Sequence, residues 1–192
     1  KVPIQEAKNM STLKIISKLN QQKVDYNNMK VWSGFFFNKK FELPMSTMTT
    51  QQVDLTERKQ IFLDYKMFLD YDIDLVSIGE ALQTLYPLQE IDVIPQIAYA
   101  ECKEGWDLGP HIHDNEVALH MTVFLNEDEN EGLYVHNTEE NFYNDAVYVK
   151  NIYDNCCVFP FTGKEWHGLK GDKINGIRKL LYIDWMKNND KV

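Results

Sequence analysis

The second half of the chain is divided into short apolar segments separated by polar turns, and this pattern constrains the fold more than any other feature. The segments are rich in β-branched and aromatic residues and recur at roughly eight- to twelve-residue intervals. They cover residues 93–102, 119–125, 133–136, 146–153, 156–161 and 179–185. Short strands at this spacing predict a β-sandwich or β-barrel.

The first ninety residues carry helix signals instead, and we expect them to be mostly helical. Ser11 can cap a short helix, and Asp54-Leu-Thr-Glu57 resembles a capping box. A second cap signal, Ser77-Ile-Gly-Glu80, opens a short helix that Pro87 ends. Apolar residues follow the first box at one-face helical spacing, namely Ile61, Phe62, Tyr65, Phe68 and Leu69. Only residues 31–37, aromatic and bounded by polar residues, are strand-like.

Helices followed by strands predict an α+β protein, mainly β, with the helices packed on one outer face of a barrel. The length of 192 residues and the 44% apolar content fit a single domain over residues 1–192. Within it, residues 1–90 form the mostly helical part and residues 91–187 the β core.

Composition narrows the classes of partner and compartment. The net charge of −9 and the absence of a basic stripe disfavour nucleic acid. The sequence contains no run of eighteen apolar residues, so it does not predict a membrane span. Three cysteines, two of them adjacent, favour reduced thiols in the cytoplasm over a disulfide framework. The chain starts at Lys1, which leaves open whether the natural start is present, and it shows no signal-peptide pattern. Oligomeric state is not encoded in any pattern we recognise.

Three histidines and one arginine mark the predicted site. His111 and His113 are two residues apart, so on a β-strand their side chains project from the same face. His167 lies within Trp166-His-Gly168, and Arg178 follows in an aliphatic run. Imidazole is a ligand for Fe, Cu, Ni and Zn. This combination predicts a mononuclear metal site lined by strands, with a cation placed for an anionic co-substrate.

The same stretches resemble the 2-oxoglutarate/Fe(II)-dependent dioxygenase superfamily, in particular its prolyl-hydroxylase-like and phage-type members. The resemblance covers roughly residues 92–186 and rests on six short segments. They are Gly-Pro-His111-x-His113, Phe124-Leu125-Asn126, Glu131-Gly132, Val158-Phe159-Pro160, Trp166-His167-Gly168 and Gly176-Ile-Arg178. It implies a double-stranded β-helix (jelly-roll) fold, iron bound by His-x-Asp…His, and 2-oxoglutarate whose far carboxylate meets Arg178.

The chain departs from that family in its metal ligands. The family has an acid where this chain has His113, and Asp114 follows one residue later. Strand alternation favours His111, His113 and His167 as the ligands, and Asp114 stays the alternative to His113. Leu180 also stands where the family carries a hydroxyl residue, so one hydrogen bond to the co-substrate carboxylate is either missing or supplied from elsewhere. Tyr99, on a preceding strand, is a candidate donor.

The sequence therefore predicts an Fe(II)- and 2-oxoglutarate-dependent oxygenase, an oxidoreductase that is most simply a hydroxylase. It would use O₂ and act on a protein side chain, an amino acid or another small molecule. The alternative is a cupin-like metal protein, either a dioxygenase or a binding module, that does not use 2-oxoglutarate. Arg178 separates the two hypotheses, because only the first gives it a role in the site. For His120 there are two interpretations, a residue that lines the barrel near the metal and a hydrogen-bonded strand histidine, and the second is favoured.

Overall fold

The computed structural model describes most of the chain from Asn20 onward. The described residues are 20–23, 30–37, 40–43, 52–55, 57–85, 92–106, 108–113, 115–126, 132–170 and 174–188.

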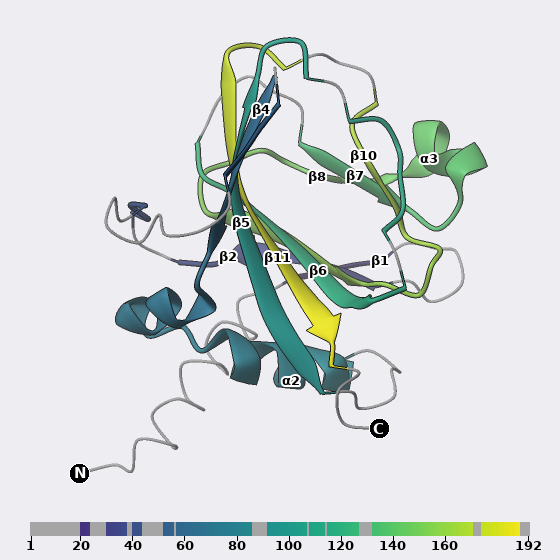
Figure 1. Cartoon of the computed structure of the whole chain (residues 1–192). Helices are drawn as coiled ribbons and strands as arrows, with labels where there is room; N and C mark the ends of the chain where they lie inside the picture. The colour runs from purple at the N-terminus through teal and green to yellow at the C-terminus, as the bar shows by residue number, and fades with distance from the viewer. Residues whose placement is uncertain are drawn as a thin grey trace.

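Eight of the described strands form one large antiparallel sheet (Figure 1), in the order β1-β2-β9-β6-β11-β5-β4-β3. Their bounds are β1 Asn20–Lys23, β2 Lys30–Phe35, β3 Gln52–Leu55, β4 Arg58–Leu63, β5 Val93–Lys103, β6 Val117–Phe124, β9 Asn155–Pro160 and β11 Ile177–Lys187. The last strand, β11, lies between β5 and β6 and pairs with both along most of its length. Four of the six apolar segments of the second half therefore form the centre of this sheet, as β5, β6, β9 and β11.

A smaller sheet of three described strands has the order β10-β7-β8 and packs against one face of the large sheet. It contains β7 Leu133–His136, β8 Val147–Val149 and β10 Trp166–Gly168. One buried apolar cluster joins the two sheets, with Leu133 and Val135 from β7 beside Phe124 and Leu180 from the large sheet. The helix α3, Glu139–Asp145, packs on β7. The protein is thus mainly β, with two antiparallel sheets face to face.

Helical segments cover the opposite face of the large sheet. These are the 3-10 helix η2, Tyr65–Tyr71, and the helix α2, Leu75–Leu85. The larger buried cluster lies between them and the sheet, and it includes Phe68, Leu82, Ile183 and Trp185. Because apolar layers cover both faces, every residue of β6 is buried. This explains why six of its eight residues are apolar, while its two polar residues, His120 and Thr122, hydrogen-bond each other.

The strands predicted for the second half and for residues 31–37 are confirmed, with shifts of a few residues at their ends. The prediction of a mostly helical part over residues 1–90 is wrong for the described residues, where β1 to β4 precede η2 and α2. The helix at Ser11 lies outside the described residues. The apparent capping box at Asp54 and Glu57 instead spans the turn between β3 and β4, which pair as a hairpin. Pairing of β4 with β5 supplies long-range hydrogen bonds that override this local signal.

The helix predicted to begin after Ser77 begins earlier, at Leu75. Asp74, not Ser77, precedes α2, and its carboxylate accepts hydrogen bonds from the Ser77 amide (3.4 Å) and hydroxyl (3.0 Å). At its other end α2 stops at Leu85, close to the predicted stop. Among the described residues, none of the helices has the length and apolar character needed to span a membrane.

Candidate metal centre and cavity

A single β-bridge brings the two distant histidine motifs together. His111 and His113 lie in the connection between β5 and β6, and His167 lies in β10. The His111 amide donates to the His167 carbonyl and the His167 amide donates to the His111 carbonyl, both at 3.0 Å. The sequence predicted a regular strand at His111 and His113, whereas the structure has only an isolated β-bridge at His111. The imidazoles nevertheless converge as predicted.

Gly168 makes that approach possible. Its φ is +150°, and a Cβ there would lie 2.4 Å from the Gly109 carbonyl oxygen and 2.7 Å from that of Leu108. Only glycine fits at such a separation, because real Cβ atoms do not approach backbone oxygens so closely. The next residue closes the contact, since the Leu169 amide donates to the Leu108 carbonyl at 2.8 Å. The glycine after His167 therefore lets β10 lie against the loop that carries His111.

The three imidazoles present one potential metal ligand atom each within 4.8 Å of one another. His167 Nε2 lies 3.1 Å from His113 Nε2. Two nitrogens bound at right angles to one metal ion, each at about 2.1 Å, would be about 3 Å apart. The geometry of this pair therefore fits two neighbouring ligands of a single metal ion.

Backbone carbonyls fix the tautomers of two of these rings. His111 Nδ1 lies 3.0 Å from the Gly109 carbonyl oxygen, and His167 Nδ1 lies 3.0 Å from that of Glu165. A carbonyl only accepts, so each Nδ1 carries the proton and each Nε2 keeps its lone pair. The lone pair of His167 then faces His113 Nε2, and a shared cation would satisfy both.

Burial keeps the triad neutral. It lowers the pKa of His113 to about 4, with the neighbouring His120 adding to the effect. Burial also lowers the pKa of His111 and holds that of His167 well below its ordinary value. Near pH 7 all three rings are therefore in the unprotonated form that binds metals. The donor set fits iron or another imidazole-binding metal.

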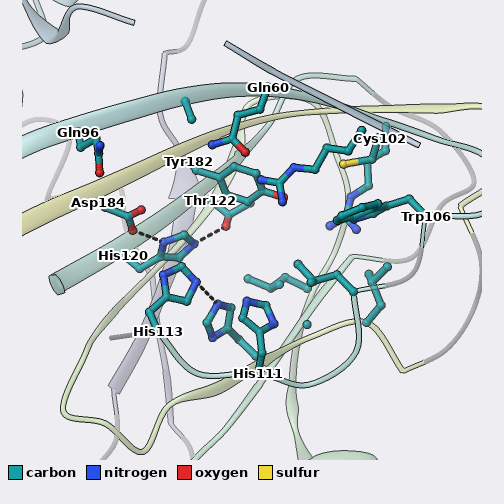
Figure 2. A pocket seen from close by; sticks show the side chains of 18 of the residues that line it. Gln60, Gln96, Cys102, Trp106, His111, His113, His120, Thr122, Tyr182 and Asp184 are labelled. Carbon is teal, nitrogen blue, oxygen red and sulfur yellow. Dashed lines mark hydrogen bonds and ion pairs between the residues drawn. The ribbon is translucent and has the colours of Figure 1, made fainter. Parts of the chain in front are cut away.

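The triad lies at one end of a cavity of about 450 Å³ between the two sheets. Figure 2 shows His111, His113 and His120 gathered on one side, with Cys102 and Trp106 on the other. Alternate residues of the central strands face this space, including Ala98 and Cys102 of β5 and Thr122 of β6. The lining on β11 consists of Arg178, Tyr182 and Asp184. The cavity is large enough for a small ligand in addition to a metal ion.

Arg178 lies on the wall of this cavity, as the sequence predicted for an anion anchor. Its side chain is only 4% exposed, and its guanidinium carbon lies 5.4 Å from the centre of the Phe124 ring. Its Nε has no hydrogen-bond partner among the described residues. A buried guanidinium without a protein acceptor is costly unless an anion reaches it. This arginine is therefore suited to hold an anionic ligand.

A second arginine, Arg58, lines the same cavity, and sequence reasoning missed it. Its guanidinium carbon lies 5.3 Å from the centre of the Trp106 ring and 5.2 Å from that of Tyr182. Its Nε also lacks a hydrogen-bond partner among the described residues. Arg58 begins β4, a segment whose local signals indicated the start of a helix. A strand assignment there would have placed it beside the β core.

His120 and Asp184 form a second polar group beside the triad. His120 Nδ1 lies 2.6 Å from Asp184 Oδ1, and His120 Nε2 lies 2.8 Å from Thr122 Oγ1. The prediction of a hydrogen-bonded strand histidine is confirmed. His113, His120 and Asp184 also have ligand atoms within 4.8 Å of one another. Because both nitrogens of His120 already have protein partners, His111, His113 and His167 are the better ligand set.

The remaining predicted residues have different outcomes. Tyr99 faces the helix-covered core, away from the cavity, and its hydroxyl donates to Glu101 at 2.6 Å. Strand alternation explains this, since the cavity-facing residues of β5 are Ala98 and Cys102. Tyr182 is the tyrosine of the cavity, and burial raises its pKa to about 12. Asp114 lies outside the described residues.

Comparison of the sequence with known proteins finds no matching family model and no matching curated protein. The structure, in contrast, is similar to several solved oxygenases. One is a prolyl hydroxylase from Trichoplax adhaerens, in complex with a hypoxia inducible factor peptide fragment, with a TM-score of 0.52 and 13% identity over 95% of this chain and 77% of that one. A 2OG-Fe(II) oxygenase family protein from Burkholderia pseudomallei has a TM-score of 0.50 and 11% identity over 97% and 80%.

A prolyl-4-hydroxylase from Pseudomonas putida has a TM-score of 0.50 and 12% identity, covering 95% of this chain and all of that one (100%). At this level of identity the likeness establishes a shared fold. The chain therefore has the fold of prolyl hydroxylases and related 2-oxoglutarate–Fe(II) oxygenases, which agrees with the resemblance noted in the sequence.

Proposed function

We propose that this protein is an Fe(II)- and 2-oxoglutarate-dependent dioxygenase, acting as a hydroxylase. The observation that carries the proposal is the placement of the histidine triad and Arg178 on the walls of one cavity. We further propose that residues 1–192 form one domain with a double-stranded β-helix core over residues 91–187. Its three buried, unpaired cysteines fit a reducing compartment such as the cytoplasm.

In this proposal His111, His113 and His167 hold the iron. When bound, iron and 2-oxoglutarate supply the oxidising chemistry that uses O₂ and yields succinate and CO₂. The protein residues bind and orient. Three imidazoles leave coordination positions free for the co-substrate, and Arg178 receives its distal carboxylate through a charge-assisted pair. The cavity lies between the two sheets, and its partial burial strengthens these electrostatic contacts.

The substrate is a small molecule, an amino acid or a side chain of a peptide. The Trichoplax prolyl hydroxylase holds a peptide fragment, which keeps a peptide segment among the candidates. The alternative function is a cupin-like metal protein that does not bind 2-oxoglutarate. The all-histidine ligand set favours it, because no described carboxylate completes the triad.

The test is an anaerobic titration of the Fe(II)-loaded protein with 2-oxoglutarate, followed by the visible charge-transfer absorption of the chelate. We expect a saturable band, and we expect Arg178→Ala to weaken 2-oxoglutarate binding at least about tenfold. Lys179→Ala is the matched control, since it removes a cation from the next position of β11, on the face away from the cavity. A band of unchanged affinity in Arg178→Ala would remove the anchoring role. Bound iron without any band would favour the cupin-like function.

A further inference from the structure

The two arginines of the cavity lie in one row across three neighbouring strands. Cys102 of β5 pairs with Arg178 of β11 on one side and with Arg58 of β4 on the other. Paired residues of adjacent strands project from the same face of a sheet, and adjacent strands are about 4.8 Å apart. The two arginine backbones are therefore about 10 Å apart across one small residue, a span that two long side chains can close.

The effects of both arginines on the pKa values of neighbouring side chains also indicate that the guanidinium groups converge. Burial raises the pKa of the Cys102 thiol, while the charges of Arg58 and Arg178 both act to lower it. Both charges also act on the Tyr182 phenol. Each arginine thus lies close enough to influence the same two side chains at the same end of the cavity.

Nothing in the described protein neutralises this pair. Neither Arg58 nor Arg178 has an ion-pair partner among the described residues, and the Nε of each is buried without an acceptor. Two neighbouring cations of this kind repel each other unless an anion lies between them. The next residue of β11 on this face, Leu180, is buried in the core between the sheets and offers no hydrogen bond.

We infer that Arg58 and Arg178 together bind a single carboxylate, the distal carboxylate of 2-oxoglutarate, so that Arg58 is a second co-substrate anchor supplied by β4. The inference rests on the proposed function and extends it to a residue outside the sequence motifs. Planar guanidinium groups approach a carboxylate through parallel hydrogen bonds, and two of them can occupy all of its lone pairs. Trp106 and Tyr182, which flank the Arg58 guanidinium, hold it in place.

The experiment compares two 2-oxo acids in the Fe(II)-loaded protein under anaerobic conditions. 2-Oxoglutarate has the distal carboxylate, and 2-oxobutyrate has the same metal-binding head without it. We expect Arg58→Gln to weaken 2-oxoglutarate binding about tenfold or more and to leave 2-oxobutyrate binding within twofold. Arg58→Lys, which keeps the charge but not the planar fork, should restore part of the affinity.

Lys59→Gln serves as the matched control, because it removes a cation from the adjacent position of β4, which pairs with Glu101 on the other face of the sheet. It should bind both acids as the wild type does. The unchanged affinity for 2-oxobutyrate within Arg58→Gln also shows that the variant is folded and loaded with iron.

Several outcomes would overturn the inference. Unchanged 2-oxoglutarate affinity in Arg58→Gln, with tight binding by the wild type, rejects the second anchor and leaves the proposed function intact. Equal weakening of both acids would also reject it, because the effect would then not depend on the distal carboxylate. A wild type that binds iron but neither acid would reject the proposed function itself.

Discussion

At the scale of single residues, two backbone carbonyls determine which nitrogen each site histidine offers to a metal. Gly109 and Glu165 accept the Nδ1 protons of His111 and His167, so both rings direct Nε2 toward the shared point. Such hydrogen bonds orient an imidazole for metal binding and raise its basicity as a ligand. The two accepting carbonyls belong to residues two positions before their histidines.

Variants distinguish this ligand set from the overlapping group of His113, His120 and Asp184. We expect His167→Ala to reduce Fe(II) or Co(II) affinity at least about 100-fold, because in our proposal His167 is a direct ligand. Asp184→Asn should change the affinity by less than about tenfold, since its carboxylate hydrogen-bonds His120, which lies outside the proposed ligand set. Equilibrium dialysis with metal analysis would measure both. Strong loss in Asp184→Asn with little loss in His167→Ala would assign the metal to the other group.

At the scale of elements, small residues on β5 leave room for the cavity, and a small residue on α2 lets this helix pack closely on the sheet. The cavity-facing small residues Ala98 and Cys102 leave space between the sheets, and long residues of β4 and β11 border it. On the other face, Trp185 of β11 packs against α2, and its indole Nε1 donates to the Leu75 carbonyl at 2.7 Å. The helix α2 therefore supports β11, the strand that carries Arg178, on the face of the sheet opposite the cavity.

Gly79→Ala tests this packing. A Cβ at Gly79 would lie 2.3 Å from Trp185 Cδ1, so the indole ring or the helix must move. Alanine favours a helix by up to about 1 kcal/mol over glycine, but overpacking a core costs about 1–3 kcal/mol. We expect net destabilisation, seen as a fall of about 2–8 °C in the unfolding temperature.

Glu80→Ala, at the next and exposed position of α2, is the control and should change the unfolding temperature little. A Gly79→Ala protein more stable than the wild type would show that helix propensity outweighs the contact with Trp185.

At the scale of the whole molecule, the buried histidines couple folding to pH. The pKa of His113 in the folded protein is about 4, below its ordinary value of 6.5, and those of His111 and His167 are also lowered. The unfolded chain therefore binds protons more readily than the folded one between pH 6.5 and 4. The stability that depends on neutral histidines is present above pH 6.5 and is lost as the pH falls toward 4.

Thermal unfolding of the metal-free protein at pH 7 and pH 4.5 measures this loss. We expect His113→Asn to lose less stability than the wild type over this interval, by about 2 kcal/mol after allowance for the partial exposure of the ring. The corresponding difference in the unfolding temperature is about 4–8 °C. Equal losses in both proteins would mean that His113 titrates alike in the folded and unfolded states.

Much of the site was predictable from the sequence because its residues lie in short, recognisable segments. The apolar segments of the second half identified the central strands, since a strand buried on both faces needs mostly apolar residues, as in β6. His111, His113, His167 and Arg178 carried their chemical character in their type and spacing. The structure places all four around one cavity.

Contacts between distant segments determined the features of the fold and the site that the sequence did not predict. The chain near Asp54 and Glu57 carries local helix signals, but β4 is a strand because β5 offers it a ladder of backbone hydrogen bonds. Only that pairing places Arg58 beside Cys102 and Arg178, and only strand register turns Tyr99 into the core and Tyr182 into the cavity. The sequence thus determined which residues have metal- and anion-binding chemistry, because that depends on side-chain type. The tertiary structure decided which of them meet, because facing and distance are set by long-range pairing.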